Sequence, residues 1–145
     1  MLWEVSSENG TEGYLVGSTH IVKPELYPLD DIYQQAFEKS DVIGFELSYD
    51  SVKVKAKSLI QKLGIYPKGK TLESTLSDDT YQLLKTRLDT LGLPVNRFQR
   101  MEPWFVAINI TVMQLRKAGY SGQQGIDKHF YTKAKEAGKE RVALE

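Results

Sequence analysis

Tyr14-Leu15-Val16-Gly17-Ser18-Thr19-His20 is the stretch around which the rest of the chain is organised. An apolar run typical of a buried strand ends at Gly17, and two hydroxyl residues and one of only two histidines follow it. Loops after the carboxyl ends of strands are where open α/β folds place ligands and chemistry. His20 is therefore a candidate catalytic or metal-binding residue, although an ordinary loop histidine has the same pattern. Gly17 allows a turn or a close approach that a Cβ would hinder.

The flanking sequence predicts a strand on each side of this stretch. Residues 2–6 alternate apolar and polar side chains, and Asn9-Gly10 is a strong signal for a hairpin turn into a strand at residues 14–18. A helix is expected over about Asp30–Lys39, and the apolar run Val42–Leu47 is typical of a buried strand. Strand, helix and strand in this order predict parallel pairing of residues 14–18 with 42–47, through a right-handed crossover.

Glu46 lies near the carboxyl end of the second of these strands. If the two strands are parallel neighbours, His20 and Glu46 leave the sheet at the same edge. An imidazole and a carboxylate at that edge can bind a divalent metal, or act as a base with its orienting partner. A glutamate at a strand end can also cap a helix or pair with a lysine, and both interpretations stay open.

The rest of the chain is mostly helical in pattern. Helices are expected over about 51–63, from residue 77 to about 91, over 104–118 and over 126–137, and residues 141–144 look like the start of another strand. Leu59, Ile60 and Leu63 are expected to face inward. The helix that begins at Trp104 is apolar on most sides and is expected to be largely buried. The element order indicates an α/β fold.

Composition excludes several classes of protein. The chain has 145 residues, which suits one domain, and 41% of them are hydrophobic, which is enough for a core. Its 19 basic and 19 acidic side chains balance, which argues against nucleic acid as the main partner. There is no cysteine, so thiolate sites and disulfides are excluded. No signal peptide and no apolar run long enough to span a membrane are present.

An ordered set of short motifs gives the chain a family resemblance. They are Leu2-Trp3-Glu4-Val5, the stretch 14–20, residues 36–42 running into Phe45-Glu46-Leu47, Leu91-Gly92-Leu93-Pro94, Glu102-Pro103-Trp104, Gly125-Ile126-Asp127 and residues 134–139. Each motif is weak by itself, but together and in this order they make the chain resemble the TraB/GumN family over nearly its whole length. That family includes TIKI proteases, which depend on manganese or cobalt, and it is similar to erythromycin esterases and haem-binding ChaN proteins.

The resemblance implies a fold and a set of site residues. The fold is α/β, with a small, mostly parallel sheet, an N-terminal hairpin strand and several covering helices. Gly17 and His20 match the first of the family's two Gly-x-x-His motifs, and Glu46 matches the acidic residue at the end of the following strand. Asp127 matches the acid after the family's Gly-Ile or Gly-Val, although an acid there also suits the helix dipole. Catalysis and metal binding are expected of His20 and Glu46, and substrate binding of Gly17 and Asp127.

One departure from the family pattern shapes the expectations about the whole protein. The second histidine, His129, lies in a predicted helix and does not match the second Gly-x-x-His motif. We therefore interpret residues 1–145 as a single, truncated TraB/GumN domain. Half a metal site binds metal only weakly, so we expect this chain to fold without metal and to show no peptidase activity by itself. Apolar surface without its cover then predicts a homo-oligomer. The closing Leu144-Glu145 suits both native sequence and a tag remnant.

Three functional hypotheses follow. The first is a metal-dependent hydrolase, by resemblance a peptidase, that uses His20 and Glu46 with a manganese- or cobalt-type ion. The second is a non-catalytic protein of the cell envelope that sequesters a peptide or other small ligand. The third, a purely structural role, has the least support. The family resemblance also implies an extracytoplasmic location in a bacterial cell envelope.

Overall fold

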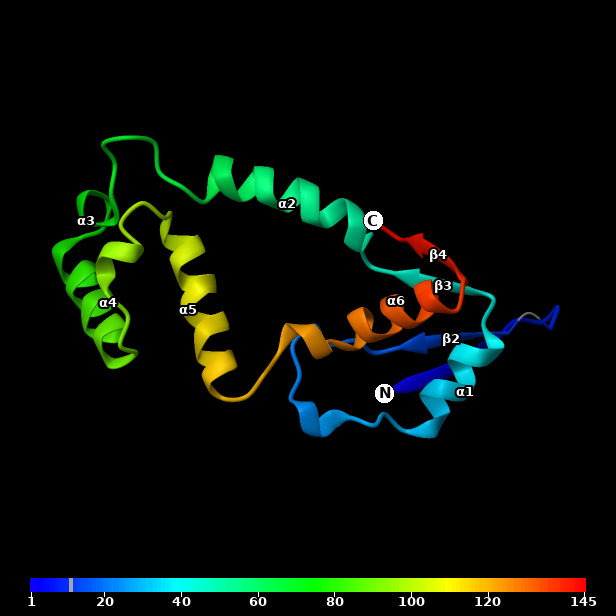
Figure 1. The fold of residues 1–145 in the computed structure, drawn as a ribbon. Coiled ribbons are helices and arrows are strands. Elements are labelled where there is room, and N and C mark those ends of the chain that lie inside the picture. The colour runs from blue at the N-terminus through cyan, green and yellow to red at the C-terminus, as the bar shows by residue number, and fades with distance from the viewer. Residues whose placement is uncertain (11) are drawn as a thin grey trace. The chain divides into compact units, whose positions relative to one another are not determined.

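The computed structural model describes residues 1–10 and 12–145, without the side chains of residues 50, 51 and 53–55. The chain divides into two compact units. One comprises Met1–Tyr49 together with Arg116–Glu145, and the other comprises Asp50–Leu115. The predicted α/β class is confirmed, because helices and strands are mixed along the chain (Figure 1). A single domain over residues 1–145 stays a prediction.

The first unit begins with the predicted hairpin. Strands β1 (Leu2–Ser6) and β2 (Glu12–Val16) pair antiparallel, with Trp3 opposite Leu15. Gly10 has a φ of 82°, a left-handed conformation that glycine adopts at no steric cost. Asn9-Gly10 was therefore the right signal for this turn.

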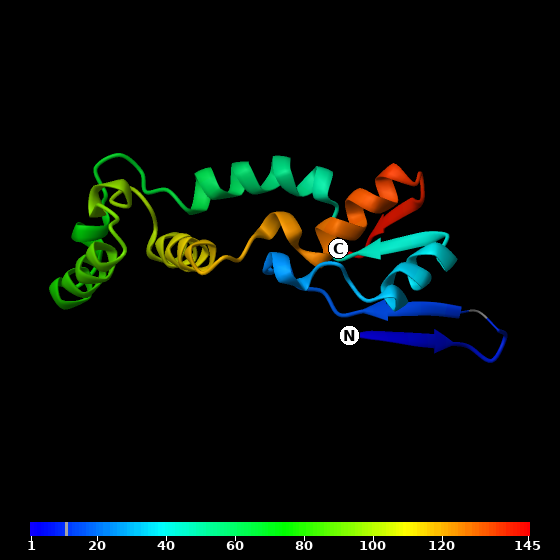
Figure 2. The same cartoon turned by 60° about the horizontal axis from the view of Figure 1, so that its bottom comes forward.

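A second pair of strands belongs to the same unit. Strands β3 (Val42–Phe45) and β4 (Glu140–Ala143) pair in parallel, with Phe45 in register with Ala143. Helices α1 (Asp31–Lys39) and α6 (Ile126–Glu136) complete the unit (Figure 2). The shared core consists of Phe37 from α1, Phe45 from β3, and Ile126, Phe130 and Ala134 from α6.

The predicted parallel pairing of residues 14–18 with 42–47 is wrong for the described residues. There β2 is bonded to β1 and β3 to β4, in two separate two-stranded sheets. The side chains of Val16 in β2 and Ile43 in β3 both pack against the Phe37–Phe130 core, so the two strands share a core rather than a hydrogen-bond ladder. Both strands nevertheless run in the same direction and end on the same side of the unit (Figures 1 and 2).

The second unit is helical. Its elements are α2 (Tyr49–Leu63), which begins at the boundary, α3 (Leu72–Thr75), α4 (Asp78–Thr90) and most of α5 (Pro103–Lys117). Short 3₁₀ turns occur at Pro24–Leu26, Val95–Arg97 and Gly122–Gln124 along the chain. The core of the second unit is made by Tyr66, Leu72, Tyr81, Leu88, Phe98 and Val106. Helix α3 was not predicted from the sequence, although Thr71 and Ser74 form a capping box at its start.

Two expectations about the burial of helix side chains are wrong. In α5, Val106 is buried, whereas Trp104 and Ile108 are 46% and 52% exposed. In α2, Leu59, Ile60 and Leu63 are exposed rather than inward-facing. Helix α5 contacts the core of its unit through the side that carries Val106 and Ile110, and this leaves the opposite side open. In the described part of the chain, no helix has the length and apolar character that crossing a membrane requires.

Candidate functional site

His20 lies in the loop that follows β2, and the chain holds this loop at several points. The amide of Gly17 donates to the Met1 carbonyl at 2.9 Å, so Gly17 lies against the start of β1. Further on, the amide of Ile126 donates to the Thr19 carbonyl at 3.0 Å. Val22 and Ser121 form an antiparallel bridge. The His20 loop is therefore fixed to the segment that leads into α6.

The His20 imidazole lies between two carboxylates. Its Nε2 atom is 3.4 Å from Oε2 of Glu46, and its Nδ1 atom contacts Oδ2 of Asp127. The proximity of His20 and Glu46 was predicted from the sequence, and the structure adds Asp127 on the opposite side of the ring. The side chains of His20 and Glu46 are 65% and 61% exposed, whereas that of Asp127 is only 12% exposed. The cluster has an open side and an inner side.

Asp127 is the inner member of this cluster. It lies in the first turn of α6, where a negative charge is stabilised by the helix dipole. Its Oδ2 atom also accepts a hydrogen bond of 3.3 Å from the Tyr49 hydroxyl. Its Oδ1 atom is buried and finds no hydrogen-bond partner among the described residues. A buried carboxylate oxygen that is left unpaired is costly, so it marks a place where a further donor or cation is favourable.

Tyr49 was not identified from the sequence, yet it belongs to the site. Burial, followed by the charge of Asp127 and the hydrogen bond to it, raises the pKa of Tyr49 to about 12. The charge of Glu46 acts in the same direction. The hydroxyl therefore remains a hydrogen-bond donor at all ordinary pH values. The one sequence signal was an aromatic residue shortly after Glu46, which is too common to select it.

The arrangement suits two kinds of chemistry. When Nδ1 of a neutral histidine donates to a carboxylate, the lone pair of Nε2 is free to act as a base or a ligand. Here Nε2 of His20 lies 3.4 Å from Oε2 of Glu46. This is less than twice the ligand distance of about 2.0–2.2 Å that is typical of a divalent ion such as zinc, so both atoms can bind one ion. His20 and Glu46 thus fit as a two-ligand set, with Asp127 as the outer partner that orients the histidine. Within the described residues, no group of three or more His, Cys, Asp or Glu side chains is arranged to hold a metal.

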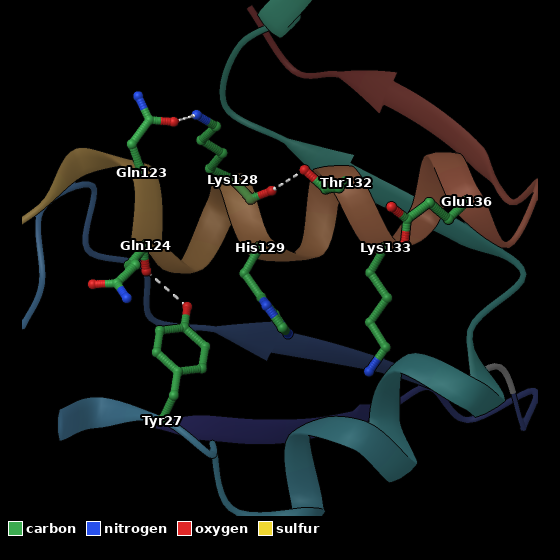
Figure 3. Close-up of a pocket in the computed structure, with 8 residues that line it drawn as sticks. All are labelled: Tyr27, Gln123, Gln124, Lys128, His129, Thr132, Lys133 and Glu136. Carbon is green, nitrogen blue, oxygen red and sulfur yellow. Dashed lines mark hydrogen bonds between the residues drawn. The ribbon is translucent and has the colours of Figure 1, made fainter. Parts of the chain in front are cut away.

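A separate cavity lies along another side of α6 (Figure 3). Its volume is about 470 Å³, and its lining consists of Tyr27, Gln123, Gln124, Lys128, His129, Thr132, Lys133 and Glu136. The Tyr27 hydroxyl donates to the Gln124 carbonyl at 2.7 Å. Burial, assisted by the charge of Lys133, lowers the pKa of His129, which favours its neutral form. No motif in the sequence pointed to this cavity, and none of the predicted site residues lines it.

Comparison with models of known protein families gives a match over the full length. The profile of the TraB/PrgY/gumN family matches residues 1–145, which is the whole chain. No curated protein and no solved structure gives a significant match.

Proposed function

This chain belongs to the TraB/PrgY/gumN family, and we propose that it carries part of the active site of a metal-dependent hydrolase that acts on peptides. The observation that supports this proposal is the position of His20 between Glu46 and Asp127. The metal dependence and the peptide substrate come from the resemblance to TIKI-type relatives. The geometry supports them because it provides a ligand pair on an open side of the fold.

Each member of the cluster has a distinct role in this proposal. His20, through Nε2, and Glu46 would hold a divalent ion of the manganese or cobalt type. Such an ion would supply Lewis acidity and lower the pKa of a bound water. Asp127, which contacts Nδ1, would accept a hydrogen bond from it and thereby fix the tautomer of His20, and the Tyr49 hydroxyl, which donates to Asp127, would hold that carboxylate in place. The open side of the cluster leaves room for a peptide to approach His20 and Glu46.

The test is a peptide digest in a longer protein that supplies the second Gly-x-x-His motif, with manganese or cobalt added or removed. We expect cleavage with metal only, and no cleavage by the 145-residue chain alone. His20→Ala and Glu46→Gln should each abolish cleavage, whereas His129→Ala should not, because His129 lies in the separate cavity. Cleavage that survives chelation, or that His20→Ala leaves unchanged, would refute the metal mechanism.

A second candidate function is binding of a small ligand without turnover. The observation that favours it is the cavity of about 470 Å³ along α6, which lies apart from the His20 cluster. This function predicts saturable binding of a peptide or small molecule that persists after chelation. A substitution in the cavity, such as His129→Ala, would then weaken binding, and His20→Ala would leave it intact.

A further inference from the structure

The residue that packs against the backbone of His20 is a glycine. A Cβ atom built on Gly125 would lie 2.4 Å from the His20 carbonyl oxygen, 2.9 Å from its carbonyl carbon and 3.1 Å from its Cα. Contacts below 3.0 Å do not occur for real Cβ atoms, and all three atoms belong to the backbone, which cannot rotate away as a side chain can. Gly125 has a φ of −52° and a ψ of 142°, which suit any residue. Space rather than backbone conformation therefore requires glycine here.

This close approach occurs where α6 begins. Gly125 is the N-cap residue of α6, Ile126 donates its amide to Thr19 at 3.0 Å, and Asp127 follows in the first turn. The contact therefore determines how far the start of α6 lies from the His20 loop. Any side chain at residue 125 would need space for at least a methyl group between the two segments. The segments would therefore have to move apart. The Asp127 carboxylate would then move away from Nδ1 of His20.

We propose that Gly125 is a positioning residue, which brings the first turn of α6 against the His20 backbone so that Asp127 reaches Nδ1 and Nε2 faces Glu46. A role of this contact in catalysis rests on the proposed function. The contact itself, and its effect on the His20 imidazole, do not depend on that function. Gly125 acts through Asp127 and His20 and touches no substrate.

Gly122 provides a matched control in the same segment. A Cβ on Gly122 would lie 3.7 Å from the same His20 carbonyl oxygen, which is an ordinary van der Waals contact. Gly122→Ala therefore adds a methyl group near His20 without displacing its backbone. A difference between Gly122→Ala and Gly125→Ala reports the close approach rather than a general sensitivity of the loop.

The experiment measures the tautomer of His20 by ¹⁵N NMR of the imidazole, in a buffer alkaline enough to keep it neutral and without any metal. In the unchanged chain and in Gly122→Ala, we expect the proton on Nδ1, because Asp127 accepts it. In Gly125→Ala, the Nδ1–H form should fall from the major to the minor species. The longer carboxylate of Asp127→Glu, added to Gly125→Ala, should restore it, which a general loss of structure would not allow.

Three outcomes would overturn the proposal. The Nδ1–H form could persist in Gly125→Ala, Gly122→Ala could change the tautomer equally, or a nuclear Overhauser effect between the α protons of Gly125 and His20 could be absent from the unchanged chain. The last measurement decides the matter even if Gly125→Ala does not fold. Because no step uses metal or activity, a hydrolase that fails the peptide digest would leave this inference standing.

Discussion

At the scale of single residues, the site depends on which atom of His20 carries the proton. Asp127 is the less exposed carboxylate and contacts Nδ1, whereas Glu46 is exposed and faces Nε2. The two acids are therefore not equivalent. In the proposed site, Asp127 sets the tautomer, and Glu46 shares a cation with Nε2.

This difference predicts unequal effects of substituting the two acids. Asp127→Asn should lower the affinity for Mn²⁺ by about 10–100-fold, which is the usual cost of removing an outer partner of a ligating histidine. Glu46→Gln removes a ligand and should abolish detectable binding. Calorimetric titration of Mn²⁺ into the three proteins measures both effects. Equal affinities in the unchanged chain and Asp127→Asn would contradict the role given to Asp127.

Tyr49 gives a prediction for alkaline pH. Its pKa is raised from 10.0 to about 12, so the unfolded chain loses this proton before the folded chain does. The stabilisation is complete below pH 10.0 and is lost as the pH rises towards about 12. Subtracting the ultraviolet titration of Tyr49→Phe from that of the unchanged chain should isolate a phenol that ionises near the upper value. A midpoint at the ordinary value would mean that Asp127 and burial do not act on Tyr49.

The sequence predicts some of these residues and misses others for a physical reason. His20 and Glu46 each follow an apolar run, and the shared direction of β2 and β3 brings them together. The assumed ladder between those strands was not needed for this result. Gly125 packs against the His20 backbone, and Tyr49 donates a hydrogen bond to Asp127. In each of these pairs the two residues are distant in sequence. Such contacts depend on tertiary packing, and no local pattern records them.

At the scale of elements, the sequence predicts how a helix packs when only one side of the helix is apolar. When two sides are apolar, the side that meets the core is ambiguous. Helices α1, α4 and α6 have one polar side, and their observed bounds differ little from the expected ones. Helix α5 is apolar on two sides, and periodicity does not tell which side meets the core. Val106 faces the core and Trp104 does not.

Helix α4 allows a clean test of its packing. Leu88 is fully buried in the core of the second unit, whereas Leu83 in the same helix is 72% exposed. Leu88→Ala should lower the free energy of unfolding by about 2–5 kcal/mol, through lost burial and a cavity. Leu83→Ala should change it by less than about 0.5 kcal/mol. Urea unfolding of both variants measures the difference, and equal values would show that Leu88 is not a core residue.

At the scale of the whole molecule, exposed apolar side chains predict self-association. Trp104, Ile108, Leu59 and Leu63 expose large apolar groups, and such surface usually marks contact with another protein. We expect the sedimentation coefficient to rise with protein concentration, and Ile108→Ser to reduce that rise. Leu83→Ser, which changes an exposed leucine on α4, serves as the control. A monomer at all concentrations would contradict this prediction.

The central claim is that His20 and Glu46 form the metal-binding pair of this fold, with Asp127 orienting the histidine. The most direct test is to add substoichiometric Mn²⁺ to ¹⁵N-labelled chain and map which NMR signals broaden, because paramagnetic broadening is local and detects even weak binding. The account predicts broadening around His20, Glu46 and Asp127, its loss in His20→Ala, and unchanged signals around His129. Broadening centred elsewhere, or a pattern that His20→Ala leaves unaltered, would contradict it.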